Sequence, residues 1–178
     1  MNDLESLRYP IGRFEMPAII TEENVQEYIR ILEELPTQLV KTVENFDDKN
    51  FDTPYRENGW TVQQVIAHVA DAHSRAYVRF KQGLQENKIL VKAHNKTKVS
   101  DFLMHHNTVV QAALQTISNV HNSWVSDLKS LSDNDLKLVF FYPDAGRIIS
   151  LPEFLAIFVW HSKHHFAHIK SLKDRMAW

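Results

Sequence analysis

Four segments of this chain carry apolar residues at the spacing of an amphipathic α-helix, and this pattern restricts the possible folds more than any other feature. The segments begin near Thr21, at Thr61, at Ser100 and at Ser150. Segments of about 20–27 residues make helices roughly 30–40 Å long. Only 4 of the 178 residues are glycine, which argues against turn-rich β architectures. The sequence therefore predicts an all-α protein that folds as a bundle of four helices.

Capping residues indicate where two of these helices begin. Thr61 is followed three residues later by Gln64, and Ser150 is followed by Glu153. Both pairs match a capping box, in which two side chains satisfy backbone N–H groups of the first turn. Pro36 lies inside the first segment. We expect it to kink or split that helix, because proline lacks an N–H and clashes with the preceding turn.

The segments outside the helices are polar or β-prone. Residues 1–20 lack a helical period but hold several large apolar side chains, so we expect an extended N-terminal arm that packs across the bundle. The polar stretches 45–59 and 84–99 predict loops, and 137–149 predicts a small hairpin or an irregular crossing around a Pro-Asp-Ala-Gly turn. The length suits one domain, which we expect to span 1–178.

Composition narrows the functional classes. The formal net charge of −2 gives no basic footprint for nucleic acid. No stretch approaches the ~20 apolar residues that span a bilayer, and the acidic N-terminus does not resemble a signal peptide. We therefore expect a cytoplasmic protein without a nucleic-acid or membrane partner. Because the chain has no cysteine, a transition-metal site would have to use histidine and carboxylate ligands.

Histidine is abundant and unevenly distributed, with four of the ten in the window 161–168. His161 and His165 are four residues apart, which on a helix means ~40° of azimuth and ~6 Å along the axis. They can therefore converge on one ion, as HxxxH pairs do in metalloenzymes. The preceding turns of the same stripe hold Ile157 and Phe154. We therefore expect the histidine pair to point into the bundle.

Two histidines on one helix leave the coordination of a metal ion incomplete, so a third ligand must come from another helix. His68, at the edge of the apolar face of the second helix, is a plausible third ligand. His73 lies ~140° further round and cannot join the same site from a regular helix. Three imidazoles with one open position match catalytic rather than structural zinc sites. Such an ion lowers the pKa of bound water, and an incoming thiol could instead bind as thiolate.

Each of these residues also has a plainer interpretation. HxxxH spacing alone is a weak signal. His164, His168 and His73 could be surface residues or hydrogen-bond partners of the ligands. Asp71 could orient a ligand histidine, or it could be a solvated carboxylate on a helix face. The remaining histidines are expected to be structural or solvated: His94, His105, His106 and His121.

Several longer stretches carry a family resemblance that spans nearly the whole chain. The most specific are 7–14 (LRYPIGRF) and 160–169 (WHSKHHFAHI), and others are 59–61 (GWT) and 68–73 (HVADAH). In these stretches the chain resembles the DinB/YfiT-like superfamily, and in particular its YfiT group. One departure is visible. The family often has a histidine pair before Val-Ala-Asp, and here the first position is Ala67.

The resemblance implies an antiparallel four-helix bundle of up-down-down-up order that forms a homodimer and binds one divalent metal ion through His68, His161 and His165. The YfiT group is named for metal-dependent hydrolysis. Related members are similar to S-transferases that use a low-molecular-weight thiol such as bacillithiol, mycothiol or glutathione as cosubstrate. Zinc or nickel is the ion expected first, although three imidazoles also accept iron, cobalt or copper.

Two functional hypotheses remain open at this stage. The first is a metal-dependent enzyme that acts on a small molecule, as a hydrolase or a thiol S-transferase, in which His164 could shuttle protons. The second is a metal-binding or stress-response bundle without turnover. The catalytic residues other than the metal ligands are not assigned by the sequence.

Overall fold

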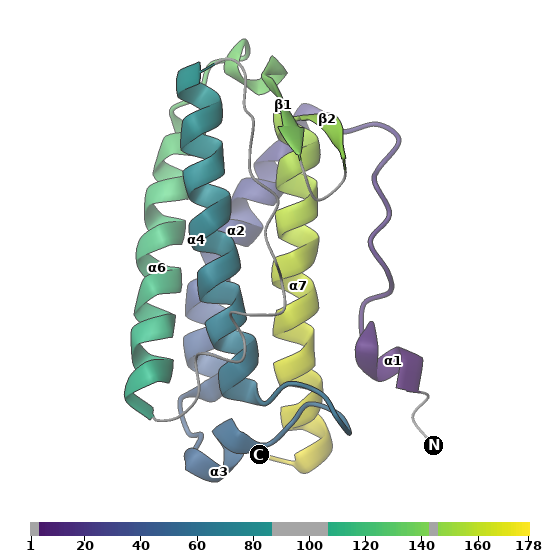
Figure 1. Cartoon of the computed structure of the whole chain (residues 1–178), viewed down its shortest axis with the longest axis vertical. Helices are drawn as coiled ribbons and strands as arrows, with labels where there is room; N and C mark the ends of the chain where they lie inside the picture. The colour runs from purple at the N-terminus through teal and green to yellow at the C-terminus, as the bar shows by residue number, and fades with distance from the viewer. Residues whose placement is uncertain (1–3, 87–106, 143–145) are drawn as a thin grey trace.

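The computed structural model describes residues 4–86, 107–142 and 146–178 (Figure 1). Four long helices make up most of this part of the chain. They are α2 (Glu22–Val43), α4 (Val62–Glu86), α6 (Asn107–Lys129) and α7 (Leu151–Met176). In Figure 1, α2 and α7 run downward while α4 and α6 run upward. This is the up-down-down-up order seen from the other end, so the predicted bundle and its topology are confirmed.

Each long helix packs against two others. Helix α6 contacts α2 and α4, and helix α7 contacts the same two from the other side. The neighbours α4 and α7 run in opposite directions (Figure 1). The first turns of α4 therefore lie beside the middle and second half of α7, which is where the histidines of the two helices occur in the sequence.

The predicted capping boxes precede α4 and α7. The N–H of Thr61 donates to Gln64 Oε1 at 2.9 Å, and the N–H of Gln64 donates to Thr61 Oγ1 at 3.3 Å. The N–H of Ser150 likewise donates to Glu153 Oε2 at 2.7 Å, and the N–H of Glu153 donates to Ser150 Oγ at 3.3 Å. These bonds fix the first residue of each helix, and with it the face on which each later histidine lies.

Pro36 does not split α2, so one of the two outcomes expected from the sequence is wrong. A proline lacks the N–H that would donate to the carbonyl four residues earlier, which here belongs to Leu32. The Nδ1–H of His121 in α6 donates to that carbonyl at 2.5 Å instead. Buried Leu35 and Leu39 hold the same segment against the core. The neighbouring helix and the core thus compensate for the missing helical hydrogen bond.

Two short helices form where the sequence predicted irregular structure. Helix α1 (Leu4–Arg8) interrupts the expected extended arm. Helix α3 (Asp48–Asp52) lies inside the expected loop 45–59 and begins with a capping box of its own. The side chain of Phe51 in α3 is buried. This burial stabilises a turn that is too short to be recognised from periodicity.

The connection between α4 and α6 is described only in part. Helix α4 takes in residues 84–86, which the sequence assigned to a loop. The rest of that predicted loop and the predicted start of the third helix at Ser100 lie outside the described residues.

Of the two outcomes expected for residues 137–149, the structure shows the hairpin. Strands β1 (Val139–Tyr142) and β2 (Arg147–Ser150) pair in antiparallel register after a short 3₁₀ turn, η1 (Asp135–Lys137). The ring of Tyr142 packs edge-on against Phe154 of α7, with centroids 6.0 Å apart. The hairpin therefore closes one end of the face between α4 and α7 (Figure 1).

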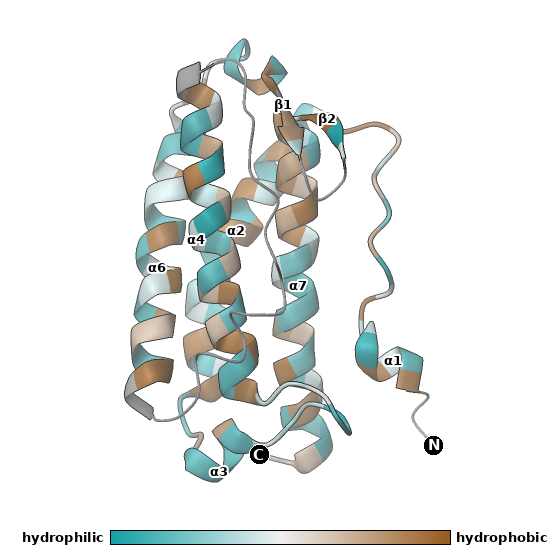
Figure 2. Cartoon of the chain, viewed as in Figure 1, coloured by the Kyte–Doolittle hydropathy of each residue, from teal (hydrophilic) through white to brown (hydrophobic). Residues whose placement is uncertain are grey.

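Two clusters of buried apolar side chains fill the bundle. The cluster near the hairpin includes Trp124 and Phe154, and the cluster near α3 includes Leu39 and Ile66. In Figure 2, the ribbon of α7 is hydrophilic about halfway along, between hydrophobic stretches. The polar middle of α7 thus lies between two apolar layers of the core.

Among the helices of residues 4–86, 107–142 and 146–178, none combines the length and the apolar character that crossing a membrane requires.

The N-terminal arm packs on α7, as predicted. The rings of Phe14 and Trp160 lie 5.8 Å apart, and so do those of Tyr9 and His164. The carbonyl oxygen of Arg8 is 3.1 Å from Nε2 of His168. The arm therefore covers the histidine-rich part of α7.

Candidate metal centre

The three histidines proposed from the sequence lie together between α4 and α7. Nε2 of His68 is 3.1 Å from Nε2 of His161. One ring nitrogen from each of His68, His161 and His165 lies within 4.8 Å of the other two. His165 is buried, whereas His68 and His161 are partly exposed. The group therefore has a buried side and an accessible side.

The donor set fits a divalent transition-metal ion. Two nitrogens bound about 2.0–2.1 Å from a tetrahedral ion lie ~3.3 Å apart. The observed separation of the two Nε2 atoms is 3.1 Å. Two imidazole lone pairs at this distance repel each other unless a cation or a proton lies between them. Imidazole ligands suit zinc, nickel, copper, cobalt or iron rather than magnesium or calcium, which prefer oxygen.

The surroundings favour the neutral form of His165. Burial lowers the pKa of His165 well below its usual value, and the neighbouring His161 and His68 lower this pKa further. Only a neutral imidazole has the lone pair that binds an ion. His165 is therefore in its ligating form at neutral pH.

Two further histidines form a line behind His161. The sequence left His73 as a surface residue or a hydrogen-bond partner of a ligand, and His121 as structural or solvated. Nδ1 of His161 is 2.9 Å from Nε2 of His73, and Nδ1 of His73 is 2.7 Å from Nε2 of His121. Both are buried, with exposed fractions of 0% and 1%. As its azimuth predicts, His73 stays outside the three-histidine group. The sequence signal for burial of His121 is its place in the apolar stripe between Ile117 and Trp124.

Two more histidines of α7 are buried beside the group. Nδ1 of His168 is 3.4 Å from Nδ1 of His165. His164 stacks on Trp160 with ring centroids 4.4 Å apart, and burial lowers its pKa to about 4. The ring nitrogens of His164, His165 and His168 form a second group within 4.8 Å. His168 therefore contacts a proposed ligand, which is one of the two outcomes expected for it. His164 is buried rather than at the surface, and its Nδ1 has no hydrogen-bond partner among the described residues.

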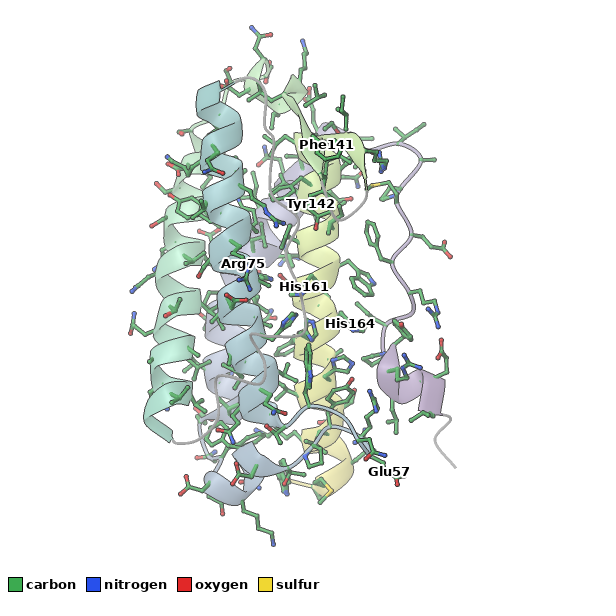
Figure 3. The ribbon with its side chains drawn as sticks, in the orientation of Figure 1. Glu57, Arg75, Phe141, Tyr142, His161 and His164 are labelled. Carbon is green, nitrogen blue, oxygen red and sulfur yellow. The ribbon has the colours of Figure 1, made fainter. Side chains whose placement is uncertain are left out.

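A cavity of about 560 Å³ opens onto the three histidines. Figure 3 shows Tyr142, Arg75 and His161 in the space between α4 and α7 that this cavity occupies. Much of its wall is aromatic, from Phe14, Trp60, Phe158 and Trp160. A second cavity of about 340 Å³ shares Tyr9, Trp60, His164 and His165 with the first.

The first cavity also has a charged section. Asp71 forms an ion pair with Arg75 one turn later in α4. Arg79, one turn further, is 8% exposed and lies 5.8 Å from the ring centre of Tyr142. That Asp71 orients a ligand histidine stays a prediction. The aromatic and charged sections together can hold a small molecule that carries both apolar and polar groups.

Comparison of the sequence with profiles of known protein families shows which family this chain belongs to. A sequence profile of the DinB superfamily matches residues 31–169. This chain belongs to the DinB superfamily. The matched range runs from within α2 to within α7 and contains His68, His161 and His165.

Similar proteins match over their full length. YfiT of Bacillus subtilis (strain 168) is 38% identical over 173 residues, which make up 97% of each protein. A protein of Bacillus cereus (strain AH820) is 40% identical over 178 residues, the whole of both chains. Both carry the name of a metal-dependent hydrolase.

The solved structure of Bacillus subtilis YfiT matches this fold with a TM-score of 0.87 and 37% identity. The match covers 97% of this chain and 99% of that one. YfiT is described as a probable metal-dependent hydrolase with an unusual four-helix bundle topology. The expected resemblance to the YfiT group is therefore confirmed.

Proposed function

We propose that this protein is a metal-dependent enzyme whose single divalent ion is held by His68, His161 and His165, with hydrolysis as the first candidate reaction. The proposal depends mainly on three imidazole nitrogens lying within 4.8 Å of one another at the wall of a cavity. The descriptions of the full-length relatives as metal-dependent hydrolases support the reaction class.

When bound to three imidazoles, such an ion supplies a Lewis acid that lowers the pKa of a nucleophile at its open position. The side chains of the protein provide the surroundings. Trp60 and Phe158 exclude bulk water from one side of the histidines, which strengthens electrostatic interactions there. Arg75 and Arg79 donate hydrogen bonds to carbonyl or carboxylate oxygens of a substrate. The substrate class is therefore a small molecule with an electrophilic centre beside such an oxygen.

Transfer of a low-molecular-weight thiol is the second candidate. It is favoured by the two cavities that share Trp60, His164 and His165, because a two-substrate reaction needs adjacent sites. The chain has no cysteine, so the thiol would enter as a cosubstrate.

Turnover by the metal-loaded protein tests the proposal. The protein is loaded separately with zinc and with nickel and incubated with a panel of esters and amides, and then with thiols plus a reporter electrophile. We expect turnover in one panel, and loss of that turnover with the metal in His161→Ala. The matched control is Lys163→Ala, which changes an exposed residue of the same helix.

The same experiment tests the competing hypothesis of a metal-binding bundle without turnover. A wild-type protein that binds one equivalent of metal but turns over no ester, amide or thiol pair would be a binding module. This result would contradict the proposed enzyme.

A further inference from the structure

Each of the two proposed ligands on α7 contacts another buried histidine through its Nδ1 atom. His161 contacts His73, and His165 contacts His168. Only Nε2 of each ligand is then left for an ion. A neutral imidazole carries its single proton on one of the two nitrogens. The position of that proton therefore decides whether Nε2 of His161 or His165 can bind a metal at all.

The line behind His161 ends on a main-chain oxygen. Nδ1 of His121 lies 2.5 Å from the carbonyl oxygen of Leu32. A carbonyl only accepts, so Nδ1 of His121 carries the proton and its Nε2 accepts from the Nδ1–H of His73. Nε2 of His73 then accepts from the Nδ1–H of His161. The lone pair of His161 is thereby placed on Nε2, the atom that faces Nε2 of His68.

The contact behind His165 leads to the same result. Nε2 of His168 lies 3.1 Å from the carbonyl oxygen of Arg8, so Nε2 carries the proton of His168. Its Nδ1 is then an acceptor, and Nδ1 of His165 lies 3.4 Å away. The proton of His165 therefore belongs on Nδ1, which leaves the lone pair on Nε2.

Pro36 explains why the first line can end where it does. In a regular helix the carbonyl of Leu32 would accept from the N–H of residue 36. Proline has no N–H, and its ring pushes the carbonyl four residues earlier away from the helix axis. The carbonyl of Leu32 is therefore free to accept from His121 of the neighbouring helix.

Both arguments require that the intermediate histidines are neutral. His73, His121 and His168 have exposed fractions of 0%, 1% and 3%. In the described part of the chain their hydrogen-bond partners are other imidazoles and carbonyls, without a carboxylate. Burying an imidazolium without a counter-charge is strongly unfavourable. A neutral imidazole donates from one nitrogen and accepts at the other, as each line requires.

We propose that His73 with His121, and separately His168, are positioning residues that fix the Nδ1–H tautomers of His161 and His165, so that both direct an Nε2 lone pair toward one ion. The consequence for metal binding rests on the proposed function, whereas the tautomers belong to the metal-free chain. The proposed ligands on α7 are therefore oriented by contacts that involve four other helices, α1, α2, α4 and α6.

The first test reads the tautomers directly. Long-range ¹H–¹⁵N correlation spectra of metal-free protein labelled with ¹⁵N-histidine distinguish Nδ1–H from Nε2–H imidazoles. Spectra of single histidine variants assign the signals. We expect the Nδ1–H form for His161, His165, His73 and His121, and the Nε2–H form for His168. A spectrum with His161 or His165 in the Nε2–H form would overturn the inference, whether or not the protein binds metal.

The second test uses matched variants. In His121→Gln, the amide N–H still donates to Leu32 and the amide oxygen still accepts from His73, whereas His121→Leu keeps bulk but can do neither. We expect His121→Leu to shift His161 toward the Nε2–H form and to weaken zinc binding about 10–100-fold in a chelator competition. His121→Gln should stay close to wild type in both measurements.

A purely structural role of His121 would give a different pattern. If His121→Gln loses as much zinc affinity as His121→Leu, or if neither variant changes it, the inference is wrong. Far-UV circular dichroism checks that the variants fold. If His121→Leu does not fold, His168→Gln and His168→Leu provide the same comparison at His165. Failure of the wild-type protein to bind either zinc or nickel would contradict the proposed function, while the tautomer spectrum still tests this inference.

Discussion

At the scale of single residues, the histidines of this chain differ in what their two ring nitrogens contact. His161 faces His68 through Nε2 and His73 through Nδ1. His121 faces a carbonyl through Nδ1 and another histidine through Nε2. A histidine thus serves as a proposed ligand or as a positioning residue, depending on which atoms its two ring nitrogens contact.

The buried His121 gives the metal-free protein a pH-dependent stability. Burial lowers its pKa in the folded chain from 6.5 to about 4, against the opposing effect of its bond to Leu32. Its other polar neighbour is His73 of α4. Between these two pH values the unfolded chain binds a proton that the folded chain does not. We predict that stability falls as the pH decreases from 6.5 to 4, by on the order of 3 kcal/mol for this group at ~1.4 kcal/mol per pKa unit.

Urea unfolding of metal-free protein at several pH values measures this effect. The His121→Gln variant lacks the titrating group and should lose less stability than wild type over the same range. Equal losses in the two proteins would exclude His121 as a source of the pH dependence.

The proposed ligands could be named from the sequence, but the contacts behind them could not. Spacing within one helix pairs His161 with His165, and the family resemblance adds His68. The contact of His73 with His121 depends on how α4 packs against α6, and no pattern within one helix contains that information. The apolar stripe of α6 could have indicated that His121 is buried, but not which atom it contacts.

At the scale of elements, α2 depends on α6 for one of its hydrogen bonds. The carbonyl of Leu32 has no helical donor because residue 36 is proline, and His121 supplies one. The sequence rule that a proline breaks a helix is based on local geometry. It fails here because the replacement donor is 89 residues away in the chain.

This dependence predicts an interaction between two positions. In the native background, His121→Leu leaves the buried carbonyl of Leu32 without a donor, which costs about 1–3 kcal/mol in addition to lost packing. In a Pro36→Ala background the N–H of residue 36 can take over. The destabilisation caused by His121→Leu should therefore be smaller in that background by at least ~1 kcal/mol.

A double-mutant cycle measures this interaction by urea unfolding of the wild type, the two single variants and the double variant. The cycle cancels the effect of Pro36→Ala on helix propensity. Additivity within ~0.5 kcal/mol would show that the two positions are independent and contradict this account of α2.

The four helices were predictable because apolar period and capping residues are local signals. Their up-down-down-up order came from the family resemblance, and the hairpin was one of two outcomes expected for residues 137–149. Helices α1 and α3 were missed because each is one turn long and α3 is stabilised by burial of Phe51. Short helices of this kind become stable through tertiary packing rather than through their own sequence.

At the scale of the whole molecule, the N-terminal arm links α1 to the proposed metal centre. The link is the main-chain carbonyl of Arg8, which accepts from His168. Neither buried cluster contains any of residues 4–8, the part of segment 1–8 that the structure describes. We predict that deletion of residues 1–8 leaves the bundle folded but weakens zinc binding about 10-fold, because His168 loses the acceptor that orients it.

Arg8→Ala is the matched control, since it keeps the carbonyl and should bind zinc like the wild type. Zinc affinity by chelator competition and helix content by circular dichroism are the two measurements. A truncated protein with wild-type affinity would show that the arm does not act on the site.

The oligomeric state stays a prediction from the family resemblance. A homodimer should sediment with twice the chain mass of 20.8 kDa. Sedimentation equilibrium at micromolar concentration tests this. A species at the single-chain mass across the concentration range would contradict the expected dimer.

The central claim is that His68, His161 and His165 hold one metal ion, and elemental analysis after dialysis tests it most directly. Wild type and Lys163→Ala should each retain about one equivalent of a divalent ion, as expected for a single three-imidazole site. His68→Ala and His165→Ala should lose the ion while their circular dichroism remains that of a helical bundle, because the two apolar clusters are unchanged. If both variants keep one tightly bound ion, the ligand assignment is wrong.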